Sequence, residues 1–411
     1  MNHPDLLSRF LSYVAIDTQS QDEVEDFPST AKQLHLASKL KGELQDLGIT
    51  DVVVNQWGYL LATLPTNRPA PQPTIALMAH FDTSPDVSGE NVKPVLHRDY
   101  DGQDLPVSAD GLVTLRIADH PYLATKVGHT VITSDGSTLL GADDKAGIAE
   151  IMDLLTYLVT HPEFPRPTLR IVFTPDEEVG RGVDHLTVAE IGADYGYTVD
   201  GEKVGEIEDE TFCADSVDVK ITGINVHPGQ AKDKLVNAVK VAAAIVELFP
   251  RDALSPETTA GREGYIHPHH LTGSVETAVI KILIRDFTPA GLVEKEDYIR
   301  GVVAEVLARY PGAKAEVLVH ESYRNMKVVL DRYPQVIEKA IQAIRASGLQ
   351  PIQASIRGGT DGARLSFMGL PTPNLFSGGN SFHSKYEWIT LEDMGKAVEV
   401  LRNLVRLWSE G

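Results

Sequence analysis

The sequence predicts an α/β protein: a catalytic-type domain with a central, mostly parallel sheet flanked by helices, plus an inserted α+β domain. Its 411 residues are more than one compact core usually holds, so we expect two domains. Short apolar runs alternate with helical segments in the first and last parts, as in sheets of parallel strands. Between these parts the strands change to period two. We therefore expect the outer domain to comprise 1–209 and 323–411, and the insertion to comprise 210–322.

In the first part, each element is predicted from a local pattern. Apolar residues recur at helical spacing over 6–14, and a second helix over 29–47 is expected to start with a capping box of Thr30 and Gln33. The turn-rich segment 84–140 is too long for a bare loop and is expected to carry small hairpins. The other expected elements are strands at 52–54, 59–61, 74–80, 169–173 and 195–199, and a helix at 145–161.

In the insertion, residues 217–221 alternate between apolar and polar side chains, as in a sheet with one solvated face. We expect four strands and two helices there, with the α/β pattern returning after Tyr323 and a final helix capped by Thr390. The remaining expected elements are strands at 279–284, 315–319 and 352–356, and helices at 234–248, 292–310, 334–347 and 392–408.

Composition limits the classes of partner. A net charge of −21 provides no positive field for a polyanion, which argues against binding to nucleic acid or to an anionic membrane. The one cysteine, Cys213, excludes an intramolecular disulfide and a thiolate metal cluster, so any metal must be held by His, Asp and Glu. The N-terminus lacks a signal-peptide pattern and no window is apolar enough to span a bilayer, so we expect a cytoplasmic protein.

Polar residues gather where the predicted buried strands end, which is where open α/β sheets place their sites. His80 and Asp82 follow one such strand and project from the same face, so Asp82 can orient the imidazole of His80. Asp143 and Asp144 form an adjacent pair at the junction of a turn and a helix. That pair would concentrate negative charge for a cation, and the alternative is a helix N-cap.

Three further motifs follow in the chain. Glu177 and Glu178 belong to a run of three acids directly after a buried strand, where a solvated turn is the alternative interpretation. Asp200 ends the next strand, and His383 follows a glycine pair that suggests close approach of backbone to ligand. Two histidines and three carboxylates in this order are enough to hold two zinc ions with one shared bridge.

These motifs resemble those of the co-catalytic zinc peptidase family that includes carboxypeptidase G and aminoacylase. The resemblance extends over essentially the whole chain, and its most specific marks are the segments 139–147, 284–287 and 356–362. It implies a metallo-aminopeptidase that removes the N-terminal residue from tripeptides, with two Zn²⁺ per subunit. Co²⁺ and Mn²⁺ would accept the same donors.

The resemblance also implies roles for individual residues. Glu177 would be the general base and then the general acid, and Asp82 would orient His80. The peptide bond between Asp143 and Asp144 would be cis. The implied ligands are His80 and Asp200 for one zinc, Glu178 and His383 for the other, and Asp143 as the bridge.

The implied substrate contacts lie in or near the insertion. His227 would stabilise the oxyanion, although the sequence alone suggests a turn histidine. Arg285 and Arg357 are candidates for the C-terminal carboxylate of the peptide, because a guanidinium binds a carboxylate in a bidentate fork. Such a clamp, held at a fixed distance from the metals, would select tripeptides.

Two other functions remain open at this point. The same zincs would serve an N-acyl amino acid hydrolase or a carboxypeptidase, and a binding protein would keep the fold without the metals.

His267, His269 and His270 are expected in an exposed loop, with an adventitious metal site as the alternative. The resemblance further implies that two copies can pair through the insertion.

Overall fold

The computed structural model describes residues 4–69 and 71–410. The chain divides into two compact units, each with its own core. Unit 1 comprises 1–209, 326–354 and 360–411, and unit 2 comprises 210–325 and 355–359. In the described part of the chain, no helix is both long and apolar enough to cross a membrane.

Unit 1 is built on an eight-stranded sheet with the order β1-β2-β8-β3-β9-β16-β10-β15. The neighbours β8, β3, β9 and β16 run parallel to one another. β2 is antiparallel to β8, and β10 is antiparallel to β16. The sheet is therefore mixed. The prediction of parallel strands is correct for the middle of the sheet and wrong for β2 and β10, which are antiparallel to their inner neighbours. The strands are β1 (Val52–Val54), β2 (Leu60–Leu64), β3 (Ile75–His80), β8 (Leu169–Thr174), β9 (Tyr195–Gly201), β10 (Glu206–Thr211), β15 (Ile352–Ile356) and β16 (Asn374–Phe376).

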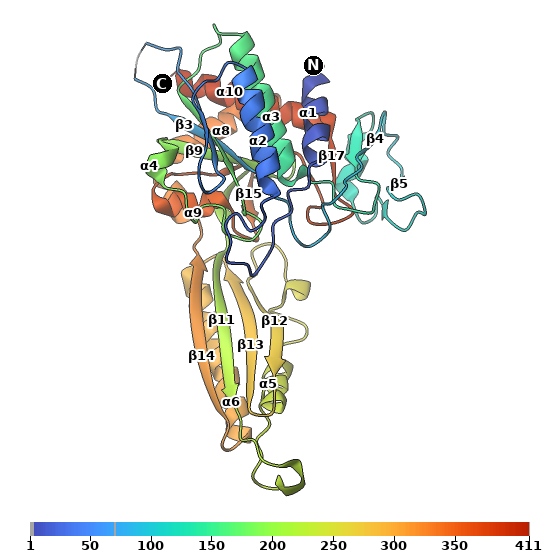
Figure 1. Cartoon of the computed structure of the whole chain (residues 1–411), viewed down its shortest axis with the longest axis vertical. Coiled ribbons are helices and arrows are strands. Elements are labelled where there is room, and N and C mark those ends of the chain that lie inside the picture. The colour runs from blue at the N-terminus through green and yellow to red at the C-terminus, as the bar shows by residue number, and fades with distance from the viewer. Residues whose placement is uncertain (1–3, 70, 411) are drawn as a thin grey trace. The chain divides into compact units, whose positions relative to one another are not determined.

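Helices cover both faces of this sheet, since every residue of the central strand β3 is buried. The helix α3 lies on β3 and β9, and α1 and α10 pack against α3 (Figure 1). An apolar cluster joins Met78 and Val172 of the sheet to Ile191 of α4 and Leu365 of α9. The helices are α1 (Pro4–Val14), α2 (Gln33–Asp46), α3 (Ala142–Thr160), α4 (Val188–Ile191), α7 (Lys327–Leu330), α8 (Pro334–Ala346), α9 (Asp361–Met368) and α10 (Leu391–Ser409).

The segment 84–140 forms small strands of its own, as predicted. β7 pairs with β4 and β17, and β5 pairs with β6, all antiparallel. Apolar side chains of this segment pack around Trp388 in a separate cluster. Its elements are β4 (Val95–His97), β5 (Leu105–Pro106), β6 (Thr114–Leu115), η1 (Pro121–Lys126) and β7 (Val131–Thr133), and the strand β17 (Trp388–Thr390), which pairs with β7, comes from the last part of the chain.

Unit 2 is a four-stranded antiparallel sheet with the order β12-β13-β11-β14, and α5 and α6 lie along it (Figure 1). Alternate residues of β11 and β13 are buried, and with apolar residues of the two helices they form the core. The elements are β11 (Cys213–Thr222), η2 (Pro228–Gln230), α5 (Ala238–Glu247), η3 (Pro256–Thr258), β12 (Tyr265–Gly273), β13 (Thr277–Asp286), α6 (Pro289–Arg309) and β14 (Lys314–Tyr323).

Three local predictions were wrong. The helix α2 begins at Gln33 without a side-chain cap, because Ser29 and the Gln33 amide instead donate to the buried carboxylate of Asp176. The helix α5 begins at Ala238 rather than 234, since Asn237 caps it by accepting from two backbone N–H groups. His267, His269 and His270 belong to the edge strand β12 and not to a loop.

Candidate metal centre

His80 is the last residue of the central strand β3 and is 3% exposed. Its Nε2 atom lies 2.9 Å from Oδ1 of Asp143 and 3.5 Å from Oδ1 of Asp200. Because β9 is parallel to β3, Asp200, the last residue but one of β9, brings its carboxylate to the same edge of the sheet. The parallel middle of the sheet therefore brings His80 and Asp200 together, and the turn at the start of α3 adds Asp143.

Asp82 connects two of the predicted motifs. Its carboxylate accepts from the backbone N–H groups of Glu177 (3.0 Å) and Glu178 (3.1 Å). On the other side, Asp82 Oδ1 lies 3.4 Å from Nδ1 of His80, and the Asp82 carbonyl lies 3.1 Å from the same nitrogen. This fully buried residue thus faces the imidazole edge that points away from Asp143, as predicted.

Asp143 lies between the two histidines. One oxygen faces His80, and Oδ2 lies 3.2 Å from Nε2 of His383. The peptide bond from Asp143 to Asp144 is cis, and both residues have non-helical backbone angles, so the regular part of α3 starts at Lys145 as expected.

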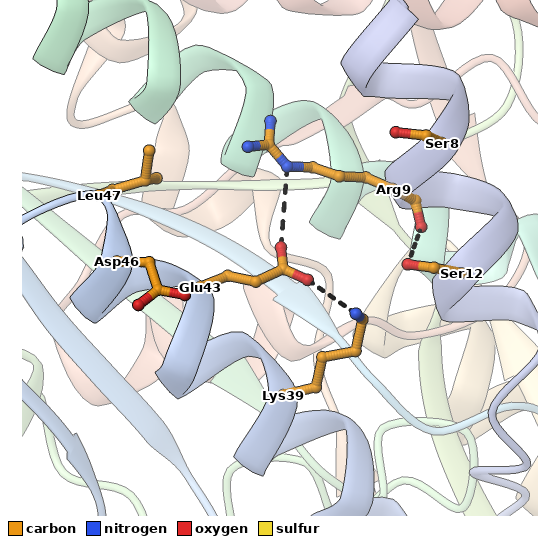
Figure 2. A pocket seen from close by; sticks show the side chains of 7 residues that line it. All are labelled: Ser8, Arg9, Ser12, Lys39, Glu43, Asp46 and Leu47. Carbon is orange, nitrogen blue, oxygen red and sulfur yellow. Dashed lines mark hydrogen bonds and ion pairs between the residues drawn. The ribbon is translucent and has the colours of Figure 1, made fainter.

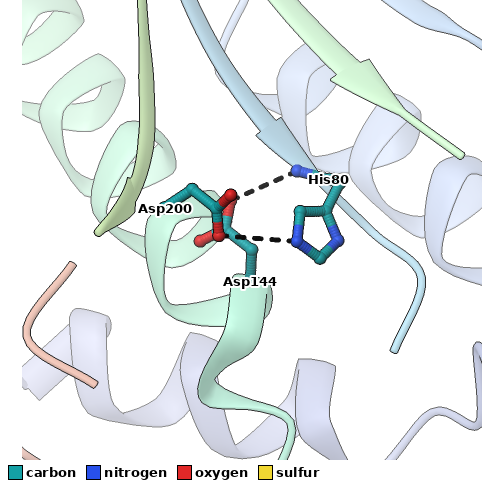
Figure 3. A group of neighbouring side chains, drawn as sticks. All are labelled: His80, Asp144 and Asp200. Atoms are coloured by element: carbon teal, nitrogen blue, oxygen red, sulfur yellow. Dashed lines mark hydrogen bonds and ion pairs between the residues drawn. The ribbon is translucent and has the colours of Figure 1, made fainter. Parts of the chain in front are cut away.

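Asp144 has a different position from Asp143. Its carboxylate accepts from the backbone N–H of His80 and of Gly147, each at 3.2 Å. Asp144 also forms a compact group with His80 and Asp200 (Figure 3). At Gly147 a Cβ atom would lie 2.0 Å from the Val199 carbonyl, so only glycine permits this close packing of α3 on β9.

Glu178 and His383 lie on the other side of Asp143. Oε2 of Glu178 is 2.8 Å from Nε2 of His383, and His80, Asp143 and Glu178 form a second compact group of potential ligands. Oε1 of Glu178 is buried and has no hydrogen-bond partner among the described residues. A buried carboxylate oxygen without a partner is costly, and a cation would remove that cost. Imidazole and carboxylate donors in this number fit a pair of divalent cations such as zinc.

The electrostatics of the cluster point the same way. Burial, together with Asp143, raises the pKa of Glu178 to about 8 and that of Asp200 to about 7. Burial opposes ionisation of Asp143 too, but hydrogen bonds from His383 and His80 hold its pKa below the usual range. So many buried acids repel one another, and cations bound among them would offset that repulsion.

Glu177 is the next residue around the cluster, with Oε2 4.0 Å from Nε2 of His80. Burial raises the pKa of Glu177 well above its usual range, and Asp200 and Asp361 add to this shift while His80 opposes it. A cavity of about 10 Å³ touches Glu177, His80, Asp200 and Asp361, which is room for about one water molecule.

Two acids of the centre had no predicted role. Glu387 is 1% exposed and accepts from the backbone N–H groups of Leu140 (2.7 Å), Gly141 (2.7 Å) and Asp143 (3.0 Å). Asp361 is buried, accepts from the Thr174 hydroxyl at 2.8 Å, and belongs to a segment that marked the resemblance. Glu387 had no local signal, because its partners lie about 245 positions away in sequence.

Two other buried polar residues, close to the predicted ligands in sequence, contact groups outside the cluster. Asp176 accepts from Ser29 and Gln33, and the buried Lys145 donates to the Ile16 carbonyl at 2.8 Å. Burial lowers the pKa of Lys145 to about 8.

The three predicted substrate contacts lie in unit 2. Nδ1 of the exposed His227 accepts from the Gly229 N–H at 3.1 Å, which makes it the turn histidine that the sequence alone suggested. Nη1 of Arg285 donates to the Ile284 carbonyl at 2.9 Å. Arg357 donates from Nη1 to the carbonyls of Gly261 and Glu263, both at 2.8 Å, so it holds a loop of its own unit.

A larger cavity, of about 440 Å³, lies between α1 and α2 (Figure 2). The two basic side chains that line this cavity already form ion pairs with a carboxylate of the same lining. Glu43 lies 3.0 Å from Lys39 and 3.7 Å from Arg9. None of the predicted site residues lines it.

Comparison with known proteins agrees with the motifs. Residues 133–407 match the model of peptidase family M20/M25/M40. Proteins named Peptidase T are similar over 98% of the chain: that of Desulfitobacterium hafniense strain Y51 is 46% identical and aligned over 98% of its own length. That of Clostridium botulinum strain Hall is 44% identical and aligned over 99% of its length.

Solved structures show the same fold. The crystal structure of aminopeptidase PepT from Bacillus cereus aligns over 100% of both chains with a TM-score of 0.76 and 24% identity. Bacillus subtilis YXEP protein, described as a dinuclear metal-binding peptidase, aligns with a TM-score of 0.66, 16% identity and coverage of 99% of this chain and 98% of its own. The predicted fold class and the prediction of a peptide hydrolase are thereby confirmed, and the chain belongs to peptidase family M20/M25/M40.

Proposed function

We propose that this chain is a two-zinc aminopeptidase that releases the N-terminal residue of tripeptides in the cytoplasm. The observation that carries the proposal is the position of Asp143 between His80 and His383, with Asp200 beside one histidine and Glu178 beside the other. The full-length relatives named Peptidase T support the peptide substrate. A chain without disulfides suits a reducing compartment.

In this proposal the ligands divide into two sets that share one carboxylate. His80 and Asp200 would hold one cation, Glu178 and His383 would hold the other, and Asp143 would be shared between them. Asp144 is not a ligand in this proposal, because its carboxylate accepts hydrogen bonds from the backbone N–H groups of His80 and Gly147. When bound, the zinc ions would polarise the scissile carbonyl and lower the pKa of water.

Glu177 is proposed as the group that moves the proton. It is buried beside the ligands, and burial raises its pKa above the usual range of a glutamate, which makes its carboxylate a stronger proton acceptor. It would take a proton from the attacking water and deliver it to the nitrogen of the leaving peptide. Asp82 fixes the backbone of Glu177 by accepting its N–H, and it also holds the ring of His80.

Unit 2 is proposed to supply the substrate contacts. We assign His227 to the oxyanion, and Arg285 and Arg357 to the C-terminal carboxylate of the peptide. Arg285 is the preferred clamp, because both Nη atoms of Arg357 already donate to backbone or side-chain oxygens of 259–263. We also infer that two copies pair through unit 2.

The test compares substrates that differ only at their ends. The purified enzyme with added zinc is expected to cleave a free tripeptide and to leave its N-acetylated form intact. A dipeptide and a tetrapeptide should be cleaved more slowly than the tripeptide. Preference for the acetylated peptide would make the chain an acylamino acid hydrolase or a carboxypeptidase, and equal rates for all three lengths would reject the carboxylate clamp.

A further inference from the structure

One carboxylate near the metal centre has no role in the proposed reaction. Asp86 lies six residues after His80, and its Oδ2 atom is 3.3 Å from Nδ1 of His383. The other nitrogen of the same ring, Nε2, faces Asp143 at 3.2 Å and Glu178 at 2.8 Å. The imidazole of His383 therefore has the proposed ligands on one edge and Asp86 on the other.

The same arrangement occurs at the first histidine. Nε2 of His80 is 2.9 Å from Asp143, and Nδ1 is 3.4 Å from the Asp82 carboxylate. Each histidine thus has one nitrogen toward Asp143 and the other toward a carboxylate of the segment 82–86. A carboxylate in this outer position keeps the proton on Nδ1 and leaves the lone pair of Nε2 free to bind a cation.

The loop that carries Asp86 is fixed on both sides of it. The amide of Gln19 donates to the Ser84 carbonyl at 3.0 Å and to the Val87 carbonyl at 2.9 Å. The backbone N–H of Asp86 donates to the Ser84 hydroxyl at 3.2 Å. Although its side chain is exposed, Asp86 therefore reaches His383 from an anchored backbone.

His383 depends more on such a contact than His80 does. The side chain of His383 is 40% exposed, whereas that of His80 is 3% exposed at the end of a central strand. His383 lies in an irregular loop where it and Ser381 both have left-handed backbone angles, with φ of 56° and 58°. A ring on such a loop has fewer neighbours to fix its orientation.

We propose that Asp86 is a positioning residue for the second cation and acts by fixing the tautomer and ring orientation of His383. The inference rests on the proposed function, because it takes the cation to be a divalent transition metal such as zinc. Asp86 would therefore set the affinity of one of the two metal positions and leave the other unchanged.

The experiment measures zinc affinity in the full-length chain after its metals have been removed. In competition with a chromophoric chelator, Asp86→Asn is expected to weaken one of two zinc sites about tenfold and to spare the other. Asp86→Glu keeps the carboxylate and should recover part of the loss. The control Asp22→Asn removes the same charge from a neighbour that interacts with Asp86, and it should change either affinity less than about threefold.

Three results would overturn the proposal. The first is that both zinc affinities of Asp86→Asn equal those of the wild type. The second is that Asp22→Asn loses as much zinc affinity as Asp86→Asn does. The third is that Asp86→Asn has a higher KM for free-amine peptides while its zinc affinities are unchanged. The last would make Asp86 a substrate contact. Because affinity is measured without substrate, a wild-type chain that binds zinc and cleaves nothing would reject the proposed function alone.

Discussion

Replacing Glu387 by glutamine tests how the bridging aspartate is held in place. Oε2 of Glu387 accepts from Leu140 and Gly141, and Oε1 accepts from Asp143. The glutamine oxygen can keep the first two bonds, but its NH₂ group would then face the Asp143 N–H, donor against donor. That buried donor costs about 1–3 kcal/mol, and the two remaining bonds lose their charge assistance at about 1 kcal/mol each.

We therefore expect Glu387→Gln to lower the free energy of unfolding of unit 1 by about 3–5 kcal/mol. All three tryptophans, Trp57, Trp388 and Trp408, lie in unit 1, so urea denaturation followed by tryptophan fluorescence reports on it. Glu338→Gln, on the exposed side of α8, is the control and should cost less than about 0.5 kcal/mol. The reasoning is refuted if Glu387→Gln unfolds at the wild-type urea concentration.

Three further predictions follow from the centre and its surroundings. Glu177→Gln should keep both metals while its turnover of a tripeptide falls at least about 100-fold, and loss of metal from this variant would instead identify Glu177 as a ligand. Asp143→Ala should lose both metals on dialysis, because Asp143 faces both histidines; retention of either metal, measured by elemental analysis, would exclude the bridge. Burial raises the pKa of Glu150 well above its usual range, so the folded chain keeps a proton that the unfolded chain releases above about pH 4.3, and stability falls as the pH rises. Glu150→Gln should therefore raise the urea midpoint more at pH 8 than at pH 5, and an equal change at both values would contradict this assignment.

The strands that carry the site could be predicted because their signals are local. The run that ends at His80 is apolar on both faces, which is typical of a central parallel strand, and the polar residues begin where it stops. The same holds for β8 before Glu177, and in β9 the acid Asp200 comes at the end of the strand. Parallel pairing then places the ends of these strands at one edge, so chain order alone predicted a cluster.

The errors arose where distant partners changed a local preference. Thr30 and Gln33 have the spacing of a capping box, but Asp176, 143 residues away, takes the Gln33 side chain. The segment that contains His267, His269 and His270 does not alternate between apolar and polar residues, because β12 is an edge strand whose C-terminal half is exposed. Glu387 was missed for the same reason, since its three donors lie at the turn that leads into α3, which only the folded chain brings near.

The cis peptide bond at Asp143–Asp144 and the roles of single carboxylates were beyond any local pattern. The bond agrees with the resemblance. Asp143 and Asp144 are adjacent and identical in type, yet one faces two imidazoles and the other two backbone N–H groups. Composition and spacing cannot separate these two positions, because the difference depends on the direction in which each side chain leaves the turn.

The most direct measurement titrates the metal-free chain with zinc while bound metal and tripeptide hydrolysis are followed together. We predict no hydrolysis without metal, and saturation of both signals at two zinc ions per chain. Hydrolysis at full rate in the presence of a strong chelator would contradict a reaction that depends on metal held by Asp143 and its two histidines. Hydrolysis that reaches its maximum while no zinc is bound would contradict it as well.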